Sequence, residues 1–474
     1  MKLSWSSISI ISRFSAVAIG LIQSIIIVKI MTVADYGLVG LVTAIAAIVG
    51  VYQNLGISSG STREIAASKD RKDAFKVFLG STLVRYLISF PLVIGLFVMA
   101  PYLGNHVYNR TEIILPLRIF SLILLIQALQ SVLNSAIQGL KEFKFLFIFQ
   151  TLIALVSLAT FVPFLIWYGY MGYFYALLVF NIISTAVLAV YCLRLFKGSI
   201  EIPTKKELKG VTKAVFSIGL FVYVIKIVFM QWQKLGPVLL GSELKDEALG
   251  IFSFALLVSS KITTISDAVT DVTLPSMTEV YEKSRDQFKS VFLTGNSKAY
   301  FLLMFSSVLL VIFKFEIFQV VDFLFNFIGK DPITTRYAES FKLMNPLILG
   351  FWAYSHINLL KSGLAVPARK LWGALISYVL MFVSTIAIYY IFGVVTVMSF
   401  SIAMGIGALI AYITFIFLIK KAIGFYPLSK KDLEYSLLSG IILVGLYMGI
   451  SSLVLGAVYL LLTYGIYQKA YKTA

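Results

Sequence analysis

The chain is poor in the residues that usually carry enzymatic chemistry. Among its 474 residues there is one cysteine, Cys192, and there are two histidines, His106 and His356. A single cysteine excludes an internal disulfide, and two distant histidines do not indicate a metal centre. The sequence also lacks the phosphate-binding loop, the nucleophile elbow and the zinc-protease helix motif. We therefore predict a protein that is not an enzyme and uses no cofactor and no metal ion.

Charged residues are scarce as well, at 13% of the chain, whereas hydrophobic residues make up 59%. A soluble domain is about a quarter charged and about half apolar. The difference predicts an integral membrane protein. Because the period-two alternation of barrel strands is absent, helices are the remaining way to span a bilayer. The fold class that we predict is therefore all-α and integral to the membrane.

Long apolar runs cover most of the sequence, and each is long enough to approach the roughly 20 residues that a crossing needs. The first run is too long for a cleavable signal peptide and has no small-residue cleavage site, so it is typical of an anchor. We predict about 14 transmembrane helices. They lie near residues 4–31, 36–60, 75–103, 113–139, 145–168, 172–194, 214–240, 248–274, 290–321, 337–363, 371–392, 395–419, 436–452 and 454–468.

The formal net charge of +18 comes from 40 basic and 22 acidic residues. Most of the basic residues follow even-numbered apolar runs, as in the segment 197–213. Cytoplasmic loops of membrane proteins collect Lys and Arg in this way. The bias predicts a multi-pass protein of the cell inner (plasma) membrane with both termini in the cytoplasm. It also explains the charge without a nucleic-acid partner and makes membrane lipids the expected surroundings.

Four cations lie well inside apolar runs, about 8–13 residues from a run end, which is roughly 12–20 Å deep. They are Arg13, Arg85, Lys226 and Lys298. A cation in hydrocarbon costs on the order of 2.5–3.5 kcal/mol even on lenient scales, so a function is expected. Other cations lie close enough to run ends to reach the headgroups, which needs no function. These are Lys29, Lys234, Lys314 and Lys361.

An internal repeat connects these positions. The segments "ADYGLVGLVTAI" (34–45) and "EALGIFSFALLV" (247–258) both place a glycine near the start of an apolar run. Aligning Gly37 with Gly250 pairs Arg13 with Lys226, Arg85 with Lys298, and Asn54 with Asp267. Repeats of this size indicate a transporter whose site lies between two halves. We predict two six-helix lobes, 1–196 and 214–420, a cytoplasmic linker, 197–213, and two additional helices in 421–474.

Polar side chains follow helical spacing on several of these runs. Lys226 and Gln233 lie on one face together with Tyr223, and Gln53 and Asn54 lie side by side on the second run. A polar stripe of this kind either lines an aqueous cavity or joins neighbouring helices. Both readings also apply to the fourth run, which contains Gln127, Gln130, Asn134 and Gln138.

Acidic residues inside the runs are scarcer than basic ones. Asp267 is the best candidate for a proton or sodium coupling site. The alternative is an ion pair with a neighbouring cation. His356 is expected to be a packed helix residue rather than a proton relay.

The stretch 20–66, "GLIQSIIIVKIMTVADYGLVGLVTAIAAIVGVYQNLGISSGSTREIA", resembles the opening of the polysaccharide transporter family. The features that carry the resemblance are Arg13, the "ADYG" turn, "NLG" at 54–56, and Arg63-Glu64. Residues 234–255 resemble the start of the second half of the same family. Its members are O-antigen-type flippases of lipid-linked oligosaccharides, in one superfamily with the lipid II flippase and the multidrug and toxin extrusion antiporters. An acid common in the family is replaced here by Gln233.

The resemblance implies a flippase that moves a polyprenyl-pyrophosphate-linked oligosaccharide from the inner to the outer leaflet by alternating access. It implies substrate contacts from Arg13, Arg85, Lys226, Lys298, Gln53, Asn54 and Gln233, with glycan-assembly proteins as further partners. Two alternatives stay open. One is a multidrug antiporter of the same architecture, which needs an acidic cavity for cationic drugs. The other is a membrane-embedded glycan polymerase or transferase, which normally has a large outer loop.

Overall fold

The computed structural model describes the backbone of residues 5–471 and the side chains of residues 18–212, 221–270, 277–284 and 287–466. The elements over this range are helices joined by turns, which confirms the predicted fold class. Within it, eight helices are long and apolar enough to cross a membrane, so the chain is a multi-pass membrane protein. Each predicted apolar run overlaps helical structure, and the number of crossings remains a prediction.

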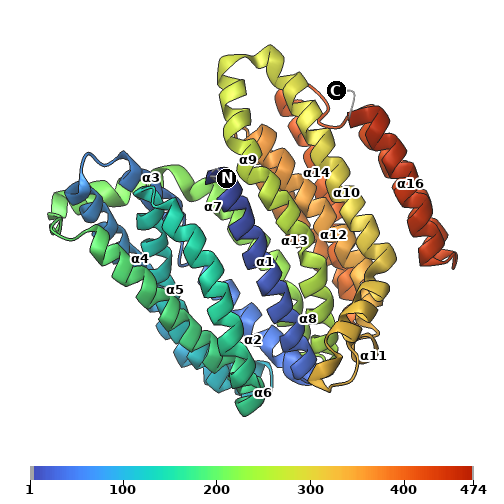
Figure 1. Ribbon diagram of the computed structural model, residues 1–474, viewed down its shortest axis with the longest axis horizontal. Helices are drawn as coiled ribbons and strands as arrows, with labels where there is room; N and C mark the ends of the chain where they lie inside the picture. Colours follow the sequence, from blue (N-terminus) through green and yellow to red (C-terminus); the bar gives the residue numbers. More distant parts are fainter. Residues whose placement is uncertain (1–4, 472–474) are drawn as a thin grey trace. The chain divides into compact units, whose positions relative to one another are not determined.

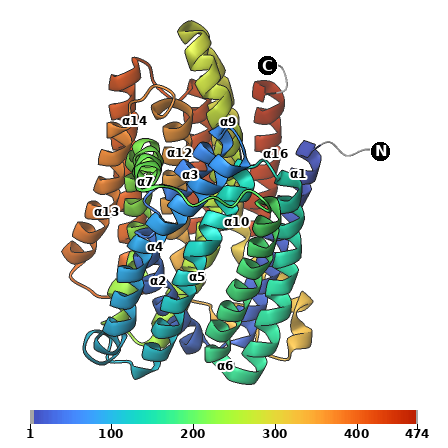
Figure 2. The ribbon, with the colours of Figure 1, turned by 90° about the vertical axis from the view of Figure 1, so that its left-hand side faces the viewer.

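The chain divides into two compact units, residues 1–250 and 251–474. In the first unit, α5 packs between α4 and α6, and α7 packs against α2, α3 and α4 (Figures 1 and 2). Its helices are α1 (Trp5–Ile30), α2 (Val33–Val51), α3 (Ile57–Ala67), α4 (Arg71–Tyr102), η1 (Leu103–Val107), η2 (Thr111–Ile113), α5 (Ile114–Gly139), α6 (Phe143–Leu195) and α7 (Lys205–Gly241). The predicted linker at 197–213 concerns the sequence repeat and stays a prediction.

In the second unit, α12 packs against α9, α10 and α14, and α10 also contacts α15 and α16. The helix α8 (Asp246–Ser260) contains the boundary between the units. The other helices are α9 (Ile262–Lys283), α10 (Arg285–Leu324), η3 (Asn326–Ile328), α11 (Ile333–Arg336), α12 (Ser340–Leu360), η4 (Lys361–Ala365), α13 (Trp372–Phe392), α14 (Val397–Ile423), α15 (Lys430–Tyr447) and α16 (Ser452–Tyr471).

Helix α7 begins at Lys205, earlier than the predicted start at 214, because a capping box forms there. The Thr204 hydroxyl accepts from the backbone N–H of Glu207, whose carboxylate accepts from the backbone N–H of Thr204. The same carboxylate lies 3.0 Å from Lys76 Nζ on α4. The bonds from Thr204 and Lys76 lower the pKa of Glu207 to about 2. The linker is therefore tied to α4 by charge.

The long helix α6 is two helices joined at Gly169, which separates the predicted runs 145–168 and 172–194. Gly169 has φ 57° and ψ −140°, a conformation that residues with a side chain rarely adopt. Three residues later, a Cβ at Gly172 would overlap the backbone of Phe164. One glycine thus permits the reversal of the chain, and the other permits the close approach that follows it.

The two glycines that the sequence repeat aligns lie against each other. A Cβ at Gly37 would be 2.8 Å from the backbone nitrogen of Gly250, and a Cβ at Gly250 would be 2.8 Å from the carbonyl carbon of Val33. Both positions therefore require glycine, because the neighbouring atoms are backbone and cannot rotate away. The start of α2 is packed directly on the start of α8.

An arginine clamp lies close to this contact. Arg110, between η1 and η2, lies 2.5 Å from Asp246 Oδ1, donates to the carbonyl of Leu244 at 2.6 Å, and also donates to the carbonyl of Gly241. A guanidinium can serve several acceptors at once because its five N–H groups form a rigid fork. The turn between α4 and α5 is thereby fastened to the turn between α7 and α8.

Cys192 belongs to an apolar cluster where α6 meets α3, α4 and α5. The thiol is buried among Ile65, Phe75, Leu133 and Leu188. Such packing is typical of a small hydrophobic core residue.

Candidate functional site

The helix predicted over 36–60 is broken in the structure. Helix α2 ends at Val51 and α3 begins at Ile57, and the five residues between them form a turn. Leu55 and Gly56 have φ of 41° and 85°, so the turn passes through the left-handed region that glycine adopts freely. The Asn54 side chain then accepts from the backbone N–H of Ser58 at 3.0 Å, which starts α3. The prediction of one continuous helix here was wrong.

A break inside an apolar helix leaves backbone carbonyls without their usual partners, which is costly in a membrane. Two side chains from other helices supply partners. Arg85 Nη1 on α4 donates to the carbonyl of Gln53 at 2.7 Å, and the Tyr223 hydroxyl on α7 donates to the carbonyl of Val51 at 2.6 Å. Their exposed fractions are 5% and 8%. The predicted residues Arg85 and Gln53 are thus brought together, by a bond to the peptide oxygen.

The turn also holds unused donors. Gln53 is 2% exposed, and its Nε2 has no hydrogen-bond partner among the described residues. The same holds for Nε of Arg85. Buried polar groups are nearly always bonded, so each such group needs an explanation. Two N–H donors next to a helix break suit an acceptor oxygen from a ligand.

Amides and hydroxyls surround the break. The Ser58 hydroxyl lies 2.5 Å from that of Ser131 on α5, and Gln231 on α7 donates to the Tyr52 hydroxyl at 3.1 Å. In the fourth predicted run, Gln130 donates to Ser184 on α6 at 2.5 Å, so this amide joins two helices. Polar side chains of α5 and α7 thus contact the turn and the start of α3.

The other predicted residues of the first unit have different surroundings. Lys226 is exposed on α7, and its Nζ lies 5.8 Å from the centre of the Tyr223 ring. Gln233 is half-buried two turns further along the same helix. Asn54 is half-buried in the turn itself. The side chain of Arg13, on α1, lies outside the described residues.

The second unit holds a separate polar cluster. Asn358 on α12 donates from Nδ2 to Asp267 Oδ1 on α9 at 3.1 Å, and its Oδ1 accepts from Lys361 Nζ at 2.7 Å. One amide therefore bridges a carboxylate and an ammonium group. Lys361 begins the π-helix η4, an element that is frequent at functional sites. Lys298 is exposed on α10.

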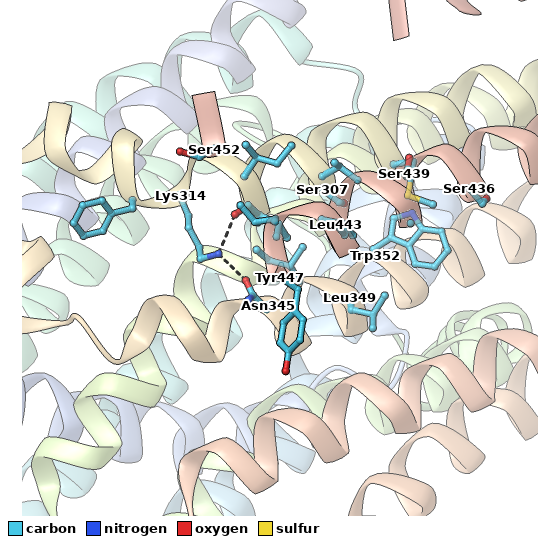
Figure 3. Close-up of a pocket in the computed structure, with 18 of the residues that line it drawn as sticks. Ser307, Lys314, Asn345, Leu349, Trp352, Ser436, Ser439, Leu443, Tyr447 and Ser452 are labelled. Carbon is cyan, nitrogen blue, oxygen red and sulfur yellow. Dashed lines mark hydrogen bonds between the residues drawn. The ribbon is translucent and has the colours of Figure 1, made fainter. Parts of the chain in front are cut away.

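The second unit also contains a cavity of about 750 Å³ between α10, α12 and α15 (Figure 3). Lys314 lies toward one end, where its Nζ donates to Asn345 Oδ1 at 2.6 Å and to the carbonyl of Val311 at 2.9 Å. Trp352 and Ser436 lie toward the other end in the same view. Aliphatic side chains form much of the wall, so the cavity suits an apolar group better than a sugar.

Several of these residues were not predicted from the sequence. Tyr223 was expected on a polar face, and its role as a partner for a broken helix was missed. Asn358 was not singled out, and Lys361 was assigned to the headgroup region. The signal for the break was present, because Asn-Leu-Gly inside an apolar run is typical of a helix interruption.

A bundle of apolar helices, some of them broken at polar residues, is typical of membrane transporters. Solved structures share the fold. The lipid II flippase MurJ in an inward closed conformation has a TM-score of 0.74 and 15% identity, with 97% of this chain and 99% of that chain covered. An inward-facing transporter of the multidrug resistance MATE family has a TM-score of 0.64 and 15% identity, with 86% of this chain and 94% of that chain covered. A transporter of the MOP superfamily from Pyrococcus furiosus has a TM-score of 0.51 and 17% identity, with 88% of this chain and 94% of that chain covered.

The sequence identifies the family more narrowly. The model of the polysaccharide biosynthesis protein family matches residues 26–322, which is more than half of the chain. The protein therefore belongs to that family, and the resemblance drawn from residues 20–66 and 234–255 is confirmed. No curated protein sequence matches the chain.

Proposed function

We propose that this protein is a flippase that moves a polyprenyl-pyrophosphate-linked oligosaccharide from the inner to the outer leaflet for the assembly of surface polysaccharide. Membership of the polysaccharide biosynthesis family supports a glycan substrate. The likeness to a lipid II flippase supports a lipid-linked form of it. The observation that carries the proposal is the gathering of cationic and amide side chains around the broken helix of the first unit.

The chemistry of these side chains suits such a substrate. A pyrophosphate is a dense anion, for which Lys and Arg are the natural counter-ions. The ammonium of Lys226 is exposed to an approaching anion, and the amides of the proposed set can bond sugar hydroxyls. The proposed binding set is Arg13, Lys226, Lys298, Gln53, Asn54 and Gln233, together with Arg85, which bonds the carbonyl of Gln53.

Alternating access would deliver the head group across the membrane while the lipid tail stays in the bilayer. We propose that the protein lies in the inner membrane with both termini in the cytoplasm. An inside-negative potential then favours outward movement of the anion, since one charge crossing 100 mV is worth about 2.3 kcal/mol. Binding energy between cations and pyrophosphate must therefore be only large enough to capture the head, because the potential assists its release.

The test is a flipping assay in proteoliposomes with a fluorescent disaccharide linked to a short polyprenyl diphosphate. Lys226→Gln removes the charge at similar length and should reduce transport at least tenfold, whereas Lys226→Arg should retain it. The exposed linker residue Lys209 gives the control Lys209→Gln, which should behave as wild type. Full transport by both Arg13→Ala and Lys226→Gln, in folded protein, would refute the proposal. Efflux of a cationic drug instead of flipping would favour the multidrug antiporter.

Asp267 is the proposed coupling site for a proton or sodium ion. Its carboxylate accepts from Asn358, which in turn accepts from Lys361, so a change of charge at Asp267 would be felt by the ammonium group. Asp267→Asn should remove the dependence of transport on a pH or sodium gradient while leaving downhill flipping in place. Unchanged gradient dependence in this variant would exclude Asp267 from coupling.

A further inference from the structure

We infer that Arg85 and Tyr223 are positioning residues that hold the turn between α2 and α3 in its non-helical conformation, so that Gln53 can offer its amide to an acceptor oxygen of the substrate. On this inference, Arg85 acts through Gln53 rather than as the counter-ion of the pyrophosphate. It deepens the proposed function and rests on it for the transport measurements. The structural part is tested on the protein without substrate.

Bonds from other helices add to those that the turn makes itself. One of the turn's own backbone bonds, from Ile57 N to the carbonyl of Asn54, is 2.7 Å long, but the three before it are long, at 3.2 Å from Tyr52 N to the carbonyl of Val49, 3.2 Å from Gln53 N to that of Gly50, and 3.5 Å from Asn54 N to that of Val51. By contrast, the two bonds that come from other helices are 2.6 and 2.7 Å long. Shorter bonds, one of them from a charged group, are the stronger ones. The caps from α7 and α4 therefore stabilise the part of the turn, residues 51–53, where its own backbone bonds are long.

Arg85 and Lys226 differ in how far they are exposed and in what they bond. Arg85 is 5% exposed and directs Nη1 at a peptide oxygen. Lys226, one helical turn from Tyr223, is exposed. The exposed lysine can follow an anion that moves through the site, whereas Nη1 of the arginine is fixed on a peptide oxygen. The buried Nε2 of Gln53, which has no partner among the described residues, is the group that the caps keep in place.

The two caps come from two different helices, α4 and α7. Because α4 and α7 both pack on α3, a movement of either helix changes the geometry of the turn. The turn can then transmit helix movement to Gln53. A capping pair on a single helix would not have this property.

The first experiment is hydrogen–deuterium exchange on the full-length, purified protein without substrate, measured on peptides that cover residues 49–60. Arg85→Gln and Tyr223→Phe should each raise exchange in this segment about tenfold, because each removes a buried hydrogen bond. Arg85→Lys provides a milder variant if Arg85→Gln does not fold. Tyr86→Phe is the matched control, because the Tyr86 hydroxyl lies 3.5 Å from the carbonyl of Leu125 and does not contact the turn.

The second experiment uses the flipping assay. Tyr223→Phe and Arg85→Lys should lower the maximal rate several-fold at a nearly unchanged KM for the head group, whereas Lys226→Gln should raise KM and leave exchange at residues 49–60 unchanged. Wild-type exchange in both Arg85→Gln and Tyr223→Phe would overturn the inference. So would an Arg85→Lys variant that transports normally while its exchange is accelerated. Absence of flipping by the wild type would refute the proposed function, whereas the exchange results would still decide the role of the caps.

Discussion

The contact between Gly37 and Gly250 makes a sharp prediction for Gly250→Ala. The added Cβ would overlap the carbonyl oxygen of Val33 and lie 2.8 Å from its carbonyl carbon, whereas ordinary contact begins at 3.4 Å. The starts of α2 and α8 must therefore part by more than the 0.6 Å that the carbonyl carbon alone requires. Because the obstacle is backbone, a side-chain rotation cannot remove it. Overpacking of this kind costs about 1–3 kcal/mol, so we expect a clear fall in thermal stability.

The assay is thermal unfolding of the purified protein in one detergent, followed for Gly250→Ala, Gly37→Ala and the control Gly95→Ala. Gly95 lies inside α4, and a Cβ there would meet nothing within 4 Å. The same substitution should stabilise that helix by about 0.5–1 kcal/mol, because alanine has the higher helix propensity. Gly→Ala should therefore lower the melting temperature at position 250 and raise it at position 95. Wild-type melting of Gly250→Ala, with a normal effect at Gly95, would refute the close contact.

Three further predictions concern the regions around the site. Gly169→Ala should lower the melting temperature at a cost of about 1–3 kcal/mol, since φ 57° and ψ −140° strain any residue with a side chain; an unchanged melting temperature would contradict it. Arg110→Met should speed hydrogen exchange in residues 241–246 by roughly tenfold or more, because Asp246 loses a charged partner; equal exchange rates would disprove the clamp. The pKa of Glu207 is lowered to about 2, so its contribution to stability is complete above pH 4.5 and is lost as the pH falls toward 2. Exchange in residues 201–209 should rise over that window, and Glu207→Gln should abolish the pH dependence.

The fold was predictable because hydrophobic length alone determines where membrane helices form. Every apolar run overlapped helical structure, whereas the sequence repeat that aligns Gly37 with Gly250 stays a prediction. The interruptions were harder. Asn-Leu-Gly marks the break at residues 52–56, but the side chains of α4 and α7 that bond its carbonyls come from distant segments, and no local pattern reveals them.

The candidate site was predicted in its residue types but not in its contacts. Intramembrane cations and amides were singled out by the cost of burying them, and their role in binding stays a prediction. Whether a given cation faces a ligand or a carbonyl depends on packing between distant segments, as Arg85 and Lys226 illustrate. The bridge between Asp267 and Lys361 shows the same limit, because Asn358 becomes their neighbour only when α9 packs against α12.

The burial of Cys192 has a practical consequence. The chain has one native thiol, and it is enclosed in an apolar cluster. Maleimide reagents in water should therefore leave the unmodified protein unlabelled. A cysteine introduced at exposed Ser242 or at exposed Lys197 would then report, against a silent background, on which face of the cell membrane each of those two turns lies.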